Sequence, residues 1–578
     1  MVRKLFTAWV LVLCLGSLAQ AQRPQVVIGA GLGAAFKAPY FQTAGTVRTL
    51  SADTAYVLTG IYYVDSTAAL NIQPGTVVLG DSATGATLCI KRGGKIYANG
   101  TAQRPIVFTT RNAPGNRRVA QWGGIILLGA ARNNQSLNQT IEGGLHASGV
   151  YGGTNDDDSS GVLRYVRVEY GGTPFLVDNE INGLTLGSVG RRTVIEYVQV
   201  SFGNDDAFEW FGGTVNAKYL VSWRNLDDDF DTDFGWSGRV QFGYAKRDPN
   251  IFDASASSNS NGFESDNQGG SSGPWPARPT TSGLFSNMTM IGPLSDTSQY
   301  SSVSGKHDYA TFIRRRSSIS IYNSLLAGFR HGVVLRDDST HWNASVDSLQ
   351  IRNTSVQAGR RLIGVDTPPT SFATGGGFNG FDGTTWLQTA SFTNNGATPR
   401  QPSAVGLSAA AFTLGTANDP RPALGSEPAI AGTNFSNPRL SGLTATTYRG
   451  AFDPSLPMSS QWTAGWTNFD PQNTNYLTGV NPTNDGSPST FSLEQNYPNP
   501  FNPVTTIRFT IPAGTGHAPS VLKVYDLLGR EVATLVNEQL AAGTFTAEFD
   551  ASRLASGTYV YQLNANGFVQ ARKMVVMK

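Results

Sequence analysis

Short stretches of alternating apolar and polar residues, broken by glycine-containing turns, run through most of the chain from Ala55 onward. The stretch "YVLTGIYYVDSTAALNIQPGTVVLGD" predicts three short strands separated by turns, and "ATLCIKRGGKIYANGTAQRPIVFTT" repeats the scheme. Helical periodicity does not interrupt these stretches. Units this short are expected to stack on one another, because none can bury a core alone. The pattern therefore predicts an all-β domain of stacked coils.

The repeat can be measured around the motifs "GNDDAFEWFGG" and "LDDDFDTDFG". A shift of 22 residues places Phe208 on Phe230 and Glu209 on Asp231. A period near 22 corresponds to one coil of three short strands and their turns. The expected layers of this stack are Phe208-Glu209, Phe230-Asp231 and Phe263-Glu264.

Later coils carry a different marker, an apolar strand that ends in asparagine. Asn323-Ser324 and Asn353-Thr354 follow this pattern, and Asn287 is a looser case. We expect these asparagines to lie at one corner of successive coils, where amide side chains can hydrogen-bond along the stack.

These residues resemble those of a known fold family. The motifs "LNIQPGTVV", "GGKIYANGTAQRPIVFT" and "VQVSFGNDDAFEWFGG" are similar to secreted bacterial proteins with a right-handed parallel β-helix of the pectate-lyase-like type. The motifs "YRGAF" and "WTAGWTNFDP" resemble the end of the helix region in that group. The resemblance implies a β-helix domain over residues 51–470, with a loop-rich closing segment at 361–447. It implies no particular chemistry, because the group has no established activity.

The last part of the chain has its own pattern. Residues 471–490 are polar and rich in Pro, Gly and Asn, which indicates a linker. Residues 491–578 alternate strands with Gly-rich turns, as in a small Ig-like β-sandwich. The motifs "NYPNPFNP", "VYDLLGREV", "LASGTYVYQL" and "RKMVVMK" closely resemble the C-terminal sorting domain of the type IX secretion system. The resemblance implies export through the periplasm of a Gram-negative bacterium to its outer surface or medium, with the type IX secretion machinery as a partner.

The first residues predict entry into the same pathway. Arg3 and Lys4 precede an apolar run that ends in a small-x-small site, which predicts a signal peptide over residues 1–21. Residues 22–50 are expected to be a leader. Their "VVIGAGLGAA" imitates a dinucleotide-binding loop, but Pro39 follows where the required helix should run, so we expect no nucleotide cofactor.

Charge and cysteine content exclude several classes of function. Without the predicted signal peptide the chain has 41 basic and 41 acidic residues, so a basic nucleic-acid-binding face is not expected. Cys89 would be the one remaining cysteine, which excludes an intramolecular disulfide and a Cys-based zinc site. No apolar run of the mature chain reaches the ~18 residues of a transmembrane helix.

The acidic repeat is the main candidate for chemistry. Side chains alternate along a strand, so the phenylalanines are expected to point inward and the carboxylates outward. Carboxylates stacked about 4.8 Å apart repel one another, so the site should be splayed into water, partly protonated, or neutralised by a cation. We expect Ca²⁺ or a similar hard cation, with a solvated acidic turn as the alternative. The candidate metal ligands are Asp205, Asp206, Glu209, Asp227, Asp228, Asp229, Asp231, Asp233 and Glu264.

A catalytic role needs more than these acids. Pectate lyases of this fold use a basic residue beside an acidic calcium site, and Lys218, Arg224 and Arg239 are weak candidates for that base. The motif "GNDDA" also resembles the paired aspartates of polygalacturonases, although the other motifs of that family are missing here. Non-catalytic sugar binding would instead need exposed aromatic side chains. The candidates for such a platform are Trp210, Trp223 and Trp236.

Together these features predict a secreted or surface-displayed β-helix protein. We expect a non-catalytic role in adhesion or in an extracellular matrix, with a polysaccharide or cell-surface glycan as the partner. The alternative is a calcium-dependent polysaccharide lyase or glycoside hydrolase, because the same fold hosts both kinds of function.

Overall fold

The computed structural model divides the chain into two compact units. The larger consists mainly of Pro24–Asn475 and the smaller mainly of Pro488–Lys578. The predicted signal peptide, residues 1–21, lies outside the described residues. The structure describes residues 23–145, 148–174, 180–255, 259–268, 277–366, 380–388, 401–477, 481–483, 491–512, 518–540 and 543–577.

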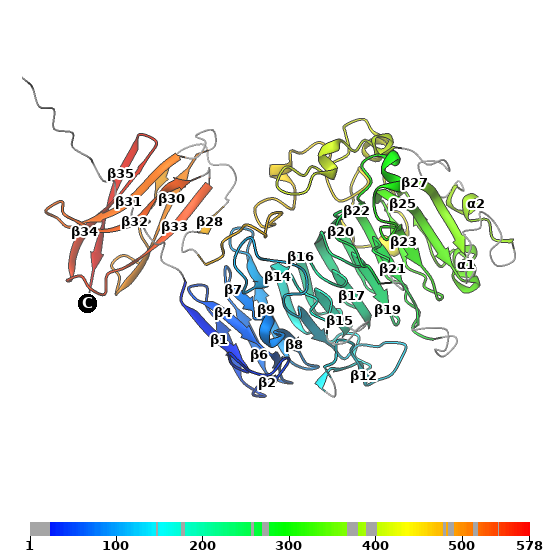
Figure 1. Ribbon diagram of the computed structural model, residues 1–578, viewed down its shortest axis with the longest axis horizontal. Coiled ribbons are helices and arrows are strands. Elements are labelled where there is room, and N and C mark those ends of the chain that lie inside the picture. Colours follow the sequence, from blue (N-terminus) through cyan, green and yellow to red (C-terminus); the bar gives the residue numbers. More distant parts are fainter. Residues whose placement is uncertain are drawn as a thin grey trace, which may run out of the picture. The chain divides into compact units, whose positions relative to one another are not determined.

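The larger unit is a parallel β-helix with three faces, as the repeat predicted (Figure 1). The first face starts with β1 (Gln25–Gly29), β4 (Ala55–Thr59), β7 (Val77–Gly80) and β10 (Ile106–Thr110). The second face contains β2 (Pro39–Gln42), β5 (Ile61–Val64), β8 (Thr87–Ile90), β11 (Ile125–Leu128), β15 (Leu184–Val189), β17 (Phe208–Gly213), β19 (Phe230–Asp233), β21 (Phe263–Ser265) and β23 (Tyr309–Ile313). The third face contains β3 (Val47–Leu50), β6 (Ala69–Ile72), β9 (Lys95–Asn99), β24 (Ser320–Tyr322) and β26 (Ile351–Arg352).

Later coils use long strands that bend from one face to the next. Strands that pass from the third face to the first are β14 (Gly161–Glu169), β16 (Val194–Ser201), β18 (Ala217–Trp223), β20 (Arg239–Lys246) and β22 (Leu284–Ile291). Strands that pass from the first face to the second are β25 (Leu325–Arg336) and β27 (Ser355–Asp366).

An aromatic column marks the bend between the third and first faces. Tyr165, Tyr197, Tyr219 and Phe242 all have positive φ, between 49° and 62°, which is uncommon for bulky residues. Their rings stack at centroid distances of 4.3, 4.4 and 5.1 Å. Since each strained corner repeats the one before it, the rings come into register and stack.

Asparagines occupy the same corner in the later coils. Asn287, Asn323 and Asn353 have φ of 55°, 52° and 49°, a conformation that asparagine tolerates. The hydrogen bonds of these side-chain amides differ from the prediction that they would run along the stack. Asn287 donates to Thr446 at 2.9 Å, and Asn323 accepts from the backbone N–H of Asn434 at 3.0 Å. These corner amides therefore tie a distant segment to the β-helix.

That segment is residues 401–475. We call it the closing segment from here on; its bounds differ from the predicted 361–447. It consists of turns and short helices rather than further coils. From Asn434 onward it runs back along the β-helix, since Thr444 accepts from Lys218 at 2.8 Å and the backbone N–H of Asn468 donates to Gln199 at 2.9 Å. Its helices are η5 (Pro402–Val405), η6 (Ala409–Phe412), α3 (Glu427–Ile430), η7 (Pro438–Leu440) and η8 (Met458–Ser460).

The remaining helices of the larger unit are also short, and no helix in the described part of the chain is long and apolar enough to span a membrane. These helices are η1 (Ser82–Thr84), η3 (Thr297–Ser301), α1 (Asp338–Ser345) and α2 (Gly383–Gln388).

The β-helix begins earlier than we expected. Residues of β1, β2 and β3 pair with β4, β5 and β6, so the prediction of a leader over 22–50 is wrong from Gln25 onward. One glycine of this stretch, Gly29, is needed for backbone packing. A Cβ on Gly29 would lie 2.2 Å from the carbonyl oxygen of Thr59, so only glycine fits there.

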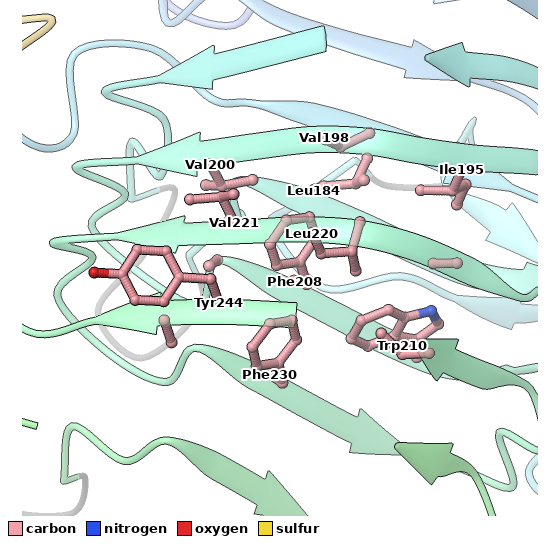
Figure 2. Close-up of a cluster of buried hydrophobic side chains, with 14 of the residues drawn as sticks. Leu184, Ile195, Val198, Val200, Phe208, Trp210, Leu220, Val221, Phe230 and Tyr244 are labelled. Atoms are coloured by element: carbon pink, nitrogen blue, oxygen red, sulfur yellow. The ribbon is translucent and has the colours of Figure 1, made fainter. Parts of the chain in front are cut away.

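The interior of the β-helix is a continuous apolar core. Phe230 stacks on Phe208 at a centroid distance of 5.5 Å (Figure 2). On its other side it stacks on Phe263, also at 5.5 Å. Leu184, Val198 and other aliphatic side chains fill the space around the rings. Strand alternation thus places the phenylalanines inside, as predicted.

A second apolar cluster lies outside the second face. Outward-facing Tyr63, Ile126 and Phe211 pack against Ile141 and Tyr151, which belong to the insertion between β11 and β14. This insertion includes an antiparallel pair, β12 (Gln139–Thr140) and β13 (Val150–Tyr151). The outer side of the second face is therefore covered here rather than open to water.

The smaller unit is a small β-sandwich with its own core, as the turn spacing predicted. One sheet contains β28 (Asn481–Thr483), β33 (Gly543–Asp550), β30 (Val504–Ile511) and β29 (Ser492–Leu493). The other contains β32 (Glu531–Leu540), β31 (Ala518–Tyr525), β34 (Gly557–Ala565) and β35 (Phe568–Val576).

Candidate metal centre

The outward side chains of the second face form one column along the β-helix. Successive coils place Cys89, Ile126, Thr185, Glu209, Asp231, Glu264, Phe312 and Val334 in register. The column is apolar at both ends and acidic in the middle. We call Glu209, Asp231 and Glu264 the acidic ladder; their predicted three-layer stacking is confirmed by the strand register.

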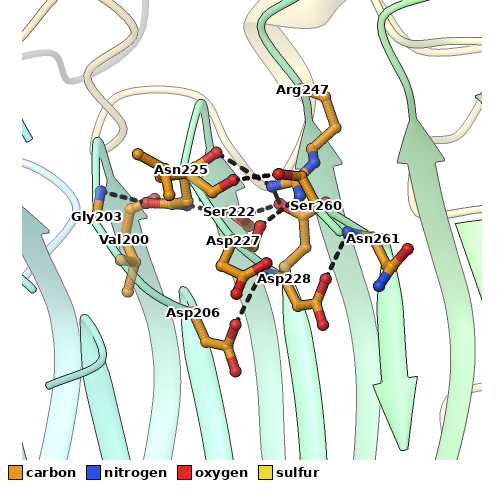
Figure 3. A network of polar contacts seen from close by, with 12 residues as sticks. Val200, Gly203, Asp206, Ser222, Asn225, Asp227, Asp228, Arg247, Ser260 and Asn261 are labelled. Atoms are coloured by element: carbon orange, nitrogen blue, oxygen red, sulfur yellow. Dashed lines mark hydrogen bonds and ion pairs between the residues drawn. The ribbon is translucent and has the colours of Figure 1, made fainter. Parts of the chain in front are cut away.

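A second row of acids lies in the turns that lead into these strands. The backbone N–H of Asp228 donates to Asp206 Oδ1 at 2.8 Å, and the N–H of Asn261 donates to Asp228 Oδ1 (Figure 3). Each carboxylate thus holds the turn of the following coil. Asp205 and Asp227 lie beside them, so the turn acids stack as the strand acids do.

Three groups of carboxylates converge closely enough to share a cation. Within each group, one oxygen per residue lies within 4.8 Å of the others. The groups are Asp205-Asp206-Asp227, Asp206-Glu209-Asp231 and Asp228-Asp231-Glu264. Because Asp206 and Asp231 each belong to two groups, the three form one continuous acidic cluster.

The cluster is more enclosed than the predicted exterior position. Glu209 is 5% exposed, and Asn182, in the turn before β15, donates to its carboxylate. Asn182 also donates to Glu142 at 3.3 Å, which brings a further acid to the site. Of the three alternatives, splaying into water does not apply to Glu209, because the insertion between β11 and β14 brings Glu142 against it, whereas Asp231 and Glu264 are half-buried.

Burial changes the acidity of the cluster. It raises the pKa of Asp206, Glu209 and Asp231 well above the ordinary range, and neighbouring carboxylates add to the effect. The pKa of Asp205, Asp228 and Asp233 is raised in the same way. The pKa of Glu142 is raised to about 7, again mainly by burial. Without a cation, the carboxyl groups of the cluster therefore keep their protons to higher pH than free carboxyl groups do.

Two carboxylate oxygens in the cluster have no hydrogen-bond partner. Asp231 Oδ1 and Asp233 Oδ1 are buried and unpaired among the described residues. Buried polar atoms are almost always hydrogen-bonded, so such orphaned oxygens need a ligand or a proton. Asp231 and Asp233 are two residues apart in β19, so both side chains lie on the outward side of this strand.

A protein cation already neutralises one end of the cluster. Arg314 Nε donates to Asp266 Oδ1 at 2.8 Å, and the same guanidinium bonds Glu264. Arg315 pairs with Asp266 as well. The unbalanced negative charge is therefore greatest around Glu209, because Arg314 also acts on Asp231.

One predicted ligand lies elsewhere. Asp229 is fully buried, accepts from the Ser222 hydroxyl and pairs with Arg247 at 3.5 Å. Its pKa is raised by burial to about 6, although Arg247 opposes the shift. Asp229 precedes β19 and does not share the strand's alternation, so its assignment to the cation site is wrong.

The predicted sugar-binding platform is also wrong. Trp210, Trp223 and Trp236 are fully buried. Trp210 packs on Trp236 at a centroid distance of 5.0 Å inside the β-helix. Trp210 lies two residues after the inward-facing Phe208, so strand alternation already indicated an inward position.

The three candidate bases make contacts outside the cluster. Lys218 donates to Thr444 and Arg239 to the carbonyl of Ser441, both in the closing segment. Arg224 pairs with Asp248. The structure therefore does not bring these residues together with the acids.

Sequence reasoning did not assign Glu142, Asp266 or Arg314 to the acidic cluster. Asp266 had a signal, because Glu264-Ser265-Asp266 repeats the alternation of Asp231-Thr232-Asp233. Glu142 had none, since the insertion that carries it lies outside the 22-residue repeat.

Comparison with known families matches both units. Residues 42–397, more than half of the chain, match the family model described as a pectate-lyase like beta helix domain. Residues 495–577 match the model of the secretion system C-terminal sorting domain. No curated protein and no solved structure matches this chain.

Proposed function

The chain belongs to the pectate-lyase-like β-helix domain family, and from this premise we propose that it is a non-catalytic extracellular protein whose acidic cluster binds Ca²⁺ or a similar hard cation. The C-terminal sorting domain directs export by the type IX secretion system to the cell surface or the extracellular space. The β-helix is thus the part delivered outside the cell, and its cation site would work there.

The donor set fits a hard cation. The three carboxylate groups offer oxygen atoms alone, without the sulfur or imidazole ligands that zinc and copper prefer. Ca²⁺ takes six to eight oxygens in flexible geometry, which suits a set spread over several coils. The carboxylates, Asn182 and the turn carbonyls could supply them.

One observation carries the proposal: Asp231 Oδ1 and Asp233 Oδ1 are buried without a hydrogen-bond partner. Carboxylates on neighbouring strands, such as Glu209 and Asp231, lie about 4.8 Å apart and repel each other by roughly 3 kcal/mol at an effective dielectric near 20. A divalent cation converts this repulsion into attraction. Without one, protonation is the remaining way to relieve it, as the raised pKa of Asp231 indicates.

The surroundings of the cluster favour a non-catalytic role. A lyase needs a base that can accept a proton beside the acids. Arg314 pairs with carboxylates at one end of the cluster, and its pairs with Glu264 and Asp266 raise its pKa well above the ordinary value. A guanidinium held in this way stays charged and is a poor base.

Binding of a polysaccharide or a surface glycan remains part of the proposal. With the three tryptophans buried, aromatic stacking does not support it, so recognition would depend on the bound cation. A carboxylate of an acidic glycan could complete the coordination of Ca²⁺. The alternative function, a calcium-dependent polysaccharide lyase or glycoside hydrolase, is favoured by the position of the acids on the flank of a pectate-lyase-like β-helix.

Calcium titration of the purified protein tests the cation site. We expect Ca²⁺ to raise the melting temperature relative to a sample with chelator, and E209Q/D231N to abolish the increase. D157N, at an exposed carboxylate outside the cluster, is the matched control and should keep it. An undiminished increase in E209Q/D231N would refute the proposed site.

A second experiment separates binding from catalysis. The wild-type protein is incubated with uronate-containing polysaccharides, with and without Ca²⁺, while unsaturated products and new reducing ends are measured. We expect neither product, together with calcium-dependent retention on at least one acidic polysaccharide. Product formation that E209Q/D231N abolishes would replace the binding role by the enzymatic one.

A further inference from the structure

The hairpin between β31 and β32 of the sorting domain ends in an exposed apolar pair. Leu527 is 68% exposed and Leu528 is 79% exposed. They belong to the turn of "VYDLLGREV" and lie outside the core cluster of the sandwich. Within the part of this unit that the structure describes, both side chains thus stay largely exposed to solvent.

The turn holds these leucines in a fixed position. The Asp526 carboxylate accepts from the N–H groups of Leu528 and Arg530, at 2.9 and 3.0 Å. Arg530 Nε also donates to Asp526 at 2.7 Å. Gly529 has a φ of 80° and supplies the left-handed residue of the turn. The apolar pair is therefore presented by a well-braced tip.

The turn itself does not require leucine. Tight turns favour Gly, Asn, Asp, Pro and Ser, and this one already has Asp526 and Gly529 in the positions that shape it. Single exposed apolar residues are common, but an adjacent pair on a braced tip suits a binding role. The edge formed by β35 is less available, because Arg572 of β35 donates to the Leu493 carbonyl and Gln495 to the Lys573 carbonyl.

We propose that Leu527 and Leu528 are a docking element for the type IX secretion machinery, and that they insert into an apolar pocket of one of its protein components. The match over residues 495–577 includes this hairpin, so the tip lies on the part of the chain that the machinery handles. A protein pocket suits the tip better than a membrane, since two leucines flanked by the charged Asp526 and Arg530 offer little apolar surface for insertion into lipid.

Export of the full-length chain from a bacterium with an active type IX system tests the docking element. We expect L527S/L528S to lower the exported fraction by roughly tenfold, with folded protein accumulating in the periplasm. L527M/L528M keeps an apolar tip and should be exported like the wild type. V569S removes an apolar side chain that is 55% exposed on β35, and it should also leave export unchanged.

Several outcomes would overturn the proposal. Wild-type export of L527S/L528S is one, and an equal loss in V569S is another. A second polar pair, L527Q/L528Q, guards against a folding defect of the serine variant; it should show the same loss with an unchanged thermal transition. Purified protein is also mixed with phospholipid vesicles, where we expect no binding. Vesicle binding by the wild type but not by L527S/L528S would assign the tip to lipid instead.

Discussion

Glu209 lies directly opposite Asp231 where β17 pairs with β19. In a parallel sheet this places two carboxylates about 4.8 Å apart, and the insertion between β11 and β14 covers the Glu209 side of the pair. The arrangement is unfavourable when both groups are charged and favourable when a cation lies between them. The pair therefore links the stability of the β-helix to pH and to divalent cations.

The first prediction concerns pH. Burial raises the pKa of Glu142 from 4.5 to about 7, and that of Glu209 and Asp231 well above the ordinary values. At pH values between the ordinary and the raised pKa, the folded protein binds more protons than the unfolded chain, so its stability falls as pH rises. In chelator, we expect the free energy of unfolding to decrease from about pH 4.5 to about pH 7.

Urea unfolding at several pH values, with and without Ca²⁺, measures this effect. Calcium should flatten the pH dependence, because a bound cation replaces the protons. A stability that rises with pH in chelator, or a pH profile that calcium leaves unchanged, would contradict the role assigned to the cluster.

The second prediction concerns the phenylalanine stack. Phe230 is fully buried between Phe208 and Phe263, so F230A should lower the free energy of unfolding by about 3–5 kcal/mol. F230L keeps much of the volume and should cost clearly less. Urea unfolding checks both variants. Equal stability of F230A and the wild type would mean that the stack does not form.

The stack and the cluster also show how far the sequence predicts this protein. The 22-residue offset and strand alternation are local properties. They correctly placed Phe208 and Phe230 on the inward side of the sheet and Glu209 and Asp231 on its outward side. The covering of Glu209 depends on an insertion outside the repeat, which no local pattern reveals. Asp229 was misassigned because it precedes the strand, where alternation does not apply. Its true partner, Arg247, is 18 residues away in the chain.

The third prediction tests the corrected position of Asp229. D229N leaves the buried guanidinium of Arg247 without its carboxylate, which should cost about 3–5 kcal/mol of stability. The calcium-induced increase in melting temperature should nevertheless persist, because Asp229 lies outside the acidic cluster. Thermal melting with and without Ca²⁺ measures both quantities. Loss of the calcium effect in D229N would return this residue to the cation site.

The fourth prediction concerns the closing segment, which runs along the aromatic column. Trp466 is buried, and its ring meets those of Tyr165 and Tyr197 edge-on, at 5.9 Å from each. W466A should therefore weaken the attachment of residues 401–475 by about 3–5 kcal/mol. Because the coils keep their own core, we expect the segment to open locally before the β-helix unfolds, which limited proteolysis would detect as cleavage within 401–475. L424A, at an exposed position of the same segment, should be cleaved no faster than the wild type. Cleavage of W466A at the wild-type rate would show that the aromatic contacts do not hold the segment in place.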